Sequence, residues 1–179
     1  MILRKSAKFC LREPPLLFKS ILMNEYNQNP KNYDPRMHSA EHVFIQTMVR
    51  MFNCGRAFSS HIEKKKSKCD FHFNRNLTVE EVAEIDRRVN EVIQADLPVR
   101  ESFIHRDEAK ERFNLSRLPE EASDTVRIVS IGDYDACPCS GMHAASSKEI
   151  GSFKVTSSDY ANGVLRVRYT IQKISPTDP

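Results

Sequence analysis

Apolar residues recur at helical spacing in two segments of the chain, which predicts two amphipathic helices. The first runs from Pro35 to about Asn53. Pro35 suits its first turn, and Gly55 lies just past its end. One apolar stripe of this helix consists of Met37, Ala40, Phe44, Met48 and Met51. Further apolar residues lie beside the stripe, so we expect the helix to be buried on much of its circumference. The second helix opens with a capping box at Thr78-Val79-Glu80-Glu81 and extends to about Ala95.

Short alternating or apolar runs predict strands between and after these helices. We expect strands at 57–62, 68–73, 98–105, 125–131, 150–156 and 164–171, and a short helix at 107–113. Helices interspersed with strands that look antiparallel indicate an α+β fold, with a mostly antiparallel sheet packed against the helices. Residues 25–35 are polar and rich in Asn and Pro. We therefore divide the chain into an N-terminal extension and linker at 1–34 and one domain at 35–175.

Composition narrows the function classes only slightly. A length of 179 residues suits one domain with a substantial core, and a net charge of +3 permits a nucleic-acid partner without requiring one. Five scattered cysteines show no disulfide framework, which favours a reducing, cytoplasmic location. No stretch approaches the roughly 18 apolar residues of a membrane span. The basic residues 1–23 are interpreted as a loosely attached extension, or as sequence preceding a biological start at Met23.

Two pairs of metal-binding residue types, far apart in the chain, share a four-residue spacing. His38 and His42 belong to the first helix, where residues four apart lie on one face. Cys139 and His143 flank Gly141 in a loop expected directly after the strand at 125–131. Imidazole nitrogen and thiolate are ligands that zinc prefers. We therefore predict one Zn²⁺ site between an early helix and a late strand-end loop.

Two features near these residues allow other interpretations. Cys137 is a rival thiolate, but we interpret it as a neighbouring free thiol because Cys139 holds the four-residue spacing to His143. The first pair also satisfies H-x-x-E-H, a metallopeptidase pattern in which Glu41 would be the general base. That pattern leaves Cys139 and His143 unexplained, so it is a minor alternative.

The runs His38-Ser39-Ala40-Glu41-His42 and Cys139-Ser140-Gly141-Met142-His143 resemble the HxxxH and CxGxH motifs of the alanyl-tRNA synthetase editing domain. The free-standing alanyl-tRNA editing proteins and the threonyl-tRNA synthetase editing domain are similar. The resemblance extends from about Pro35 to Tyr169 and includes 89–99, 126–132 and 149–153. It implies hydrolysis, in trans, of the ester of a mischarged tRNA. The expected substrate is serine or glycine on an alanine acceptor, because a synthetase pocket discriminates poorly between such small groups.

The resemblance also implies which residues meet the substrate. Ser39, Gly141 and Met142 lie between ligands, where a pocket for the amino acid would form, and the lysines Lys64, Lys65 and Lys66 could contact tRNA phosphates. A lysine-rich turn is, however, equally typical of a solvated hairpin. No catalytic base and no oligomeric state can be derived from the sequence.

Two departures from the family pattern keep a second hypothesis open. The family's late motif is most often Cys-Gly-Gly-Thr-His, whereas Ser140 and Met142 replace a glycine and the threonine here; Glu41 stands where a small polar residue is common. The alternative is a non-catalytic, zinc-stabilised domain that binds tRNA or another partner. A methionine side chain filling the space beside the metal would favour it. Zinc held by four protein ligands is typical of structural sites, whereas catalysis requires an open position.

Overall fold

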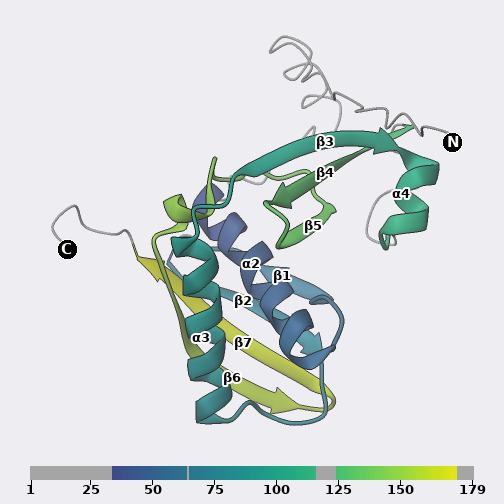
Figure 1. Cartoon of the computed structure of the whole chain (residues 1–179). Helices are drawn as coiled ribbons and strands as arrows, with labels where there is room; N and C mark the ends of the chain where they lie inside the picture. The colour runs from purple at the N-terminus through teal and green to yellow at the C-terminus, as the bar shows by residue number, and fades with distance from the viewer. Residues whose placement is uncertain (1–33, 64, 116–123, 173–179) are drawn as a thin grey trace, which may run out of the picture.

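The computed structural model describes residues 34–63, 65–115 and 124–172. Helices and strands are interspersed along the described chain, and every pair of neighbouring strands is antiparallel (Figure 1). The elements are α2 (Pro35–Phe52), β1 (Ser59–His61), β2 (Ser67–His72), α3 (Val79–Gln94), β3 (Val99–His105), α4 (Arg106–Arg112), β4 (Thr125–Ile131), β5 (Asp135–Pro138), the 3-10 helix η1 (Ser147–Ile150), β6 (Ser152–Ala161) and β7 (Val164–Gln172). The α+β class expected from the sequence is confirmed.

The larger sheet has the order β1-β2-β7-β6, and α2 and α3 pack against it. Its β6–β7 hairpin turns at Asn162 and Gly163, whose φ angles of 51° and 80° are those that an Asn-Gly hairpin turn needs. The core between helices and sheet is centred on Phe44 of α2, whose ring contacts those of Phe71, Phe153 and Tyr169. Burial of these aromatic side chains fixes the position of α2 on the sheet.

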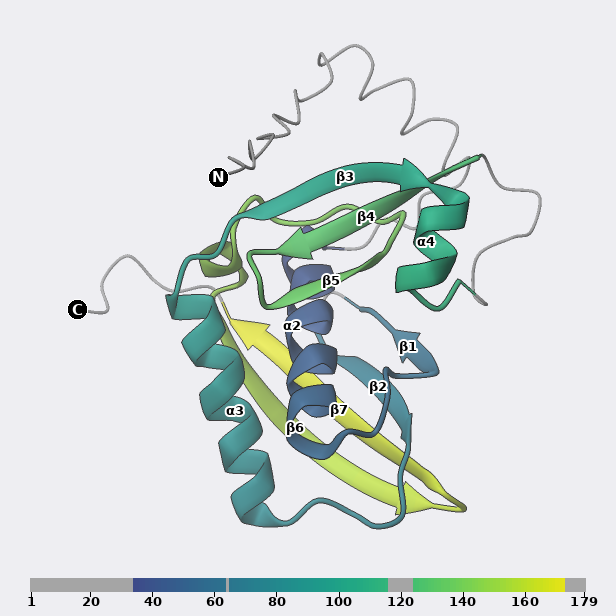
Figure 2. The ribbon, with the colours of Figure 1, turned by 45° about the vertical axis from the view of Figure 1, so that its right-hand side comes forward.

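The smaller sheet has the order β3-β4-β5 and lies over the start of α2 (Figure 2). A small apolar cluster joins it to α4, formed by Ala109, Val126 and Ile128. Helix α2 contacts β2 and β7 of the larger sheet and β5 of the smaller one. The first turns of α2 are therefore placed between the two sheets.

The antiparallel strands are divided between two sheets, a detail that the sequence did not predict. One structural expectation needs correction, because residues 135–138, expected as part of a loop, form strand β5. Strand β5 escapes detection because it is four residues long, contains a proline and is specified by its pairing with β4. The extension at 1–33 and Lys64 lie outside the described residues. Within the part of the chain that the structure describes, no helix is both long enough and apolar enough to cross a bilayer.

Candidate metal centre

Helix α2 presents His38 and His42 on one face. Its start is fixed by Asp34, whose side chain accepts a hydrogen bond from the backbone N–H of Arg36 at 3.0 Å, with Pro35 in the first turn. One helical turn separates the two histidines, so their ring centroids lie 5.2 Å apart. Both side chains are buried. The local helix signals thus determine where two of the expected ligands point.

The loop after β5 is tied to strand β4 by a buried arginine. Arg127 of β4 donates hydrogen bonds to the carbonyl oxygens of Cys139 and Gly141, at 2.7 and 2.9 Å, and forms an ion pair with Glu101. The loop also needs a glycine at 141. A Cβ there would lie 2.2 Å from Cε1 of His38, closer than real contacts allow. Sequence reasoning missed Arg127, because its position on β4 gives no sign that it faces the loop.

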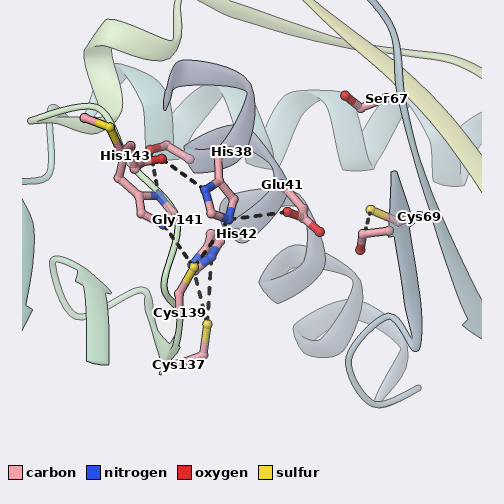
Figure 3. Close-up of polar contacts among 12 residues, drawn as sticks. His38, Glu41, His42, Ser67, Cys69, Cys137, Cys139, Gly141 and His143 are labelled. Atoms are coloured by element: carbon pink, nitrogen blue, oxygen red, sulfur yellow. Dashed lines mark hydrogen bonds and ion pairs between the residues drawn. The ribbon is translucent and has the colours of Figure 1, made fainter. Parts of the chain in front are cut away.

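The four predicted ligands meet in one cluster (Figure 3). Sγ of Cys139 lies 3.3 Å from Nε2 of His38 and 3.4 Å from Nε2 of His143, and the donor atoms of all four residues lie within 4.8 Å of one another. Tetrahedral zinc with bonds of about 2.0–2.3 Å separates its ligand atoms by roughly 3.3–3.8 Å. Three imidazoles and one thiolate at these distances fit a zinc ion.

Each histidine of this cluster has its outer ring nitrogen anchored. Nδ1 of His38 lies 3.0 Å from the carbonyl oxygen of Met142, and Nδ1 of His143 lies 3.1 Å from Oγ of Ser39. Nδ1 of His42 lies 3.3 Å from Oδ2 of Asp135. Such outer partners set the tautomer and the orientation of metal-binding imidazoles, and they leave Nε2 free for the ion.

Asp135 is part of a buried group behind His42. Arg56 pairs with both of its carboxylate oxygens, at 2.6 and 3.2 Å, and also lies 3.4 Å from Sγ of Cys137. Cys137 forms no disulfide bond with another described cysteine, and its sulfur lies 3.5 Å from Nδ1 of His42. His42, Asp135 and Cys137 could themselves form a metal-binding group, yet Arg56 already supplies the positive charge there. We therefore assign them a supporting position.

The surroundings of Cys139 and His143 favour the protonation states that bind a metal, whereas those of His42 favour its protonated form. Burial alone would raise the pKa of Cys139, but hydrogen bonds from His143 and His38 outweigh it and lower the pKa to about 2. Burial lowers the pKa of His143 to about 4, so this ring is neutral at physiological pH. Burial opposes protonation of His42, but Cys137 and Asp135 dominate and raise its pKa. The pocket thus contains a thiolate and favours positive charge.

The residues expected to meet the substrate differ in exposure. Ser39 is fully buried and accepts a hydrogen bond from the N–H of Ala144, besides contacting His143. Gly141 packs against His38, whereas Met142 is 58% exposed. These positions show Ser39 and Gly141 in contact with ligands; their roles toward a substrate stay predictions.

Among the lysines of the β1–β2 turn, Lys65 and Lys66 are exposed. Thr170 of β7 donates a hydrogen bond to the carbonyl oxygen of Lys65 at 2.7 Å and thereby ties the turn to the sheet. A surface hollow beside the turn has a mostly basic lining, formed by His61, Glu63, Lys66, Ser67, Lys68 and Arg168. The structure thus brings two cationic side chains, Lys68 and Arg168, next to the predicted ones.

Comparison with known proteins agrees with these observations. The profile of the family described as "Threonyl and Alanyl tRNA synthetase second additional domain" matches residues 126–168. Alanine–tRNA ligase of Idiomarina loihiensis is 31% identical over 170 residues, covering 88% of this chain and 19% of the ligase. The ligase of Methanopyrus kandleri is 31% identical over 139 residues, or 75% of this chain and 15% of the ligase. The chain thus spans less than a fifth of the length of these relatives.

Proposed function

The chain belongs to the alanyl-tRNA synthetase editing-domain family, and we propose that it is a zinc-dependent hydrolase that deacylates mischarged tRNA. The proposed substrates are seryl- and glycyl-tRNA with an alanine acceptor. One observation carries the proposal: two distant segments bring His38, His42, Cys139 and His143 within mutual reach, at a site with a solvent-accessible edge. That edge is formed by Cys139 and His143, which are only partly buried.

The chain's own residues prepare this site for an ester. When bound, Zn²⁺ supplies Lewis-acid chemistry, polarising a carbonyl or lowering the pKa of a water to roughly 7. The three histidines and Cys139 would hold the ion, and their outer partners restrict each ring to one orientation. Arg127 fixes the loop that forms the open edge. The aminoacyl end of a tRNA would enter at this edge, because the α2 side is buried.

The exposure of Met142 supports an enzyme rather than a non-catalytic relative. A methionine packed into the space beside the ligands would block a small aminoacyl group, but this side chain is 58% exposed. The methionine that replaces the family's usual threonine is therefore not packed into the buried side of the site. The peptidase alternative gains no support, because Cys139 and His143 join the two α2 histidines in one cluster and the H-x-x-E-H pattern assigns them no role.

The basic surface at the β1–β2 turn supports binding of tRNA. Lys65 and Lys66 are exposed, and Lys68 and Arg168 line the adjoining hollow. Phosphate contacts by such side chains are sequence-independent and weaken as salt rises. We assign this surface to the tRNA backbone. Lys64 belongs to the same turn by sequence and is included in the proposal on that basis alone.

The test is deacylation of separately charged tRNA by added protein, which also examines action in trans. Seryl- and glycyl-tRNA with an alanine acceptor, and seryl-tRNA with a threonine acceptor, are compared for wild type, His42→Ala and the control His72→Ala. His72 is an exposed histidine of β2. We expect hydrolysis of the alanine-acceptor substrates by wild type and control, and loss of both activity and zinc in His42→Ala. Zinc binding by wild type without hydrolysis of any substrate would favour the non-catalytic domain.

A further inference from the structure

The carboxylate of Glu41 lies beside the candidate metal centre and has no hydrogen bond to any residue that the structure describes. Its residue is 7% exposed, and among the described residues its one close polar contact is Nε2 of His38, 3.8 Å from Oε2 (Figure 3). The same nitrogen lies 3.3 Å from Sγ of Cys139. Glu41 is not one of the four donors that lie within 4.8 Å of one another. Its carboxylate therefore borders the ligand set from outside.

Glu41 differs from the other buried carboxylates of the described chain. Asp70 accepts two hydrogen bonds from Arg166, both at 2.7 Å. Asp86 accepts one from the backbone N–H of Val155 and pairs with Lys154, whereas Asp135 is paired with Arg56. The side chain of Glu41 is 10% exposed, so its carboxylate can be reached from outside the core. A carboxylate without such partners next to a candidate active centre can bind a cationic group of a ligand through charge-assisted hydrogen bonds.

Among the residues at 34–63, 65–115 and 124–172, none supplies an unpaired lysine or arginine next to Glu41. Its charge is one of the causes, after burial, that raise the pKa of Cys69 and of Tyr169, so both groups lie close to it as neutral neighbours. Arg56 is near enough for Glu41 to raise its pKa, but its guanidinium group is hydrogen-bonded to Asp135 and Cys137. Besides the proposed zinc ion, a cationic group of a bound molecule can therefore pair with this carboxylate.

We infer that Glu41 binds the α-ammonium group of the aminoacyl ester, an assignment that rests on the proposed function. In an aminoacyl ester this nitrogen lies about 2.5 Å from the carbonyl carbon. An ester held at the ligand cluster thus places its ammonium group beside the cluster, where Glu41 lies. A charge-assisted hydrogen bond between them selects substrates with a free amine over N-acylated ones. Glu41 would be a specificity-determining residue for this class of ester.

Binding of a non-hydrolysable substrate analogue tests the inference independently of turnover. The probe is an acceptor-stem hairpin RNA carrying serine in a 3′-amide linkage, compared with its N-acetylseryl counterpart. Dissociation constants are measured by fluorescence anisotropy for zinc-loaded wild type, Glu41→Gln, Glu41→Asp and the control Glu111→Gln. Glu111 is an exposed residue of α4. Wild type and control should bind the free amine about 10- to 100-fold more tightly than the N-acetyl form, the range expected for one hydrogen bond to a charged group.

The inference predicts that Glu41→Gln reduces this preference to within about threefold, while Glu41→Asp, which keeps the charge, retains part of it. An unchanged preference in Glu41→Gln, with both probes weakened equally, would overturn the inference and point to a general role. Loss of zinc from Glu41→Gln would overturn it as well, because the residue would then help to hold the metal. An intact amine preference without deacylation of the ester substrates would reject the proposed function alone.

Discussion

Replacing Asp135 by asparagine tests whether the outer partners of the histidines matter for metal binding. The carboxylate of Asp135 accepts from Nδ1–H of His42, across 3.3 Å, when Nε2 faces the ion. An asparagine has nearly the same shape but can present its NH₂ group, which favours the tautomer with its proton on Nε2. That tautomer cannot ligate through Nε2. Loss of such an outer partner typically weakens metal binding 10- to 100-fold, or about 1.4–2.7 kcal/mol.

The measurement is the zinc dissociation constant, obtained by competition with a chromophoric chelator at pH 7. Asp70→Asn is a matched control. Asp70 is also buried and paired with an arginine, but it lies on β2 and touches no predicted ligand. Both variants leave an arginine without its carboxylate, so both should lower the free energy of unfolding. Only Asp135→Asn should weaken zinc binding.

A zinc dissociation constant for Asp135→Asn within about threefold of the control would refute this reasoning, given the factor expected for lost outer partners. His42 would then be held in place by packing alone. The contact with Asp135 would be a consequence of burial next to Arg56 rather than a support for the ligand. The same result would also weaken the roles assigned to Ser39 and to the Met142 carbonyl, which rest on the same argument.

Three further substitutions have defined outcomes. Gly141→Ala places a Cβ 2.2 Å from Cε1 of His38, so we expect zinc affinity to fall about tenfold or more by chelator competition; an unchanged affinity would show that the loop moves freely. Arg127→Met removes two hydrogen bonds to loop carbonyls and a partly exposed ion pair with Glu101, and urea unfolding should show a loss of about 2–4 kcal/mol, because two carbonyl groups lose a charged donor. Hydrogen bonds from Arg166 lower the pKa of Asp70 in the folded protein. The ionised carboxylate therefore stabilises the fold at pH values above its unfolded pKa of about 3.9, and this stabilisation is lost as the pH falls through the lower pKa of the folded state. The difference in urea midpoint between wild type and Asp70→Asn should shrink from pH 7 to pH 3, and a constant difference would contradict the assignment.

Local sequence signals predicted the parts of the fold that depend on short-range physics. The capping box at Thr78 is present with both of its hydrogen bonds, and β4 occupies the predicted residues 125–131. Helix α2 and its apolar stripe were also predicted from the sequence, because a buried helix requires apolar residues at regular spacing. Strand β5 and the division into two sheets could not be predicted from the sequence, since both depend on how strands pair with one another.

The candidate site shows the same division between local and long-range information. Four-residue spacing identified His38, His42, Cys139 and His143, because ligand geometry constrains spacing within each segment. The supporting residues carry no such constraint. Arg56, for example, reaches Asp135 across 79 positions of the sequence, so neither residue predicts the other.

The anchoring hydrogen bonds couple the two halves of the candidate metal centre in both directions. Helix α2 supplies His38 as a predicted ligand and Ser39 as the anchor of His143, while the loop supplies His143 as a predicted ligand and the Met142 carbonyl as the anchor of His38. Displacing either segment therefore costs a ligand and an anchor at once. This reciprocity explains how three imidazoles and a thiolate stay oriented at a partly exposed edge. A departure such as Met142, which contributes through its backbone carbonyl, leaves that coupling intact because its exposed side chain takes no part in it.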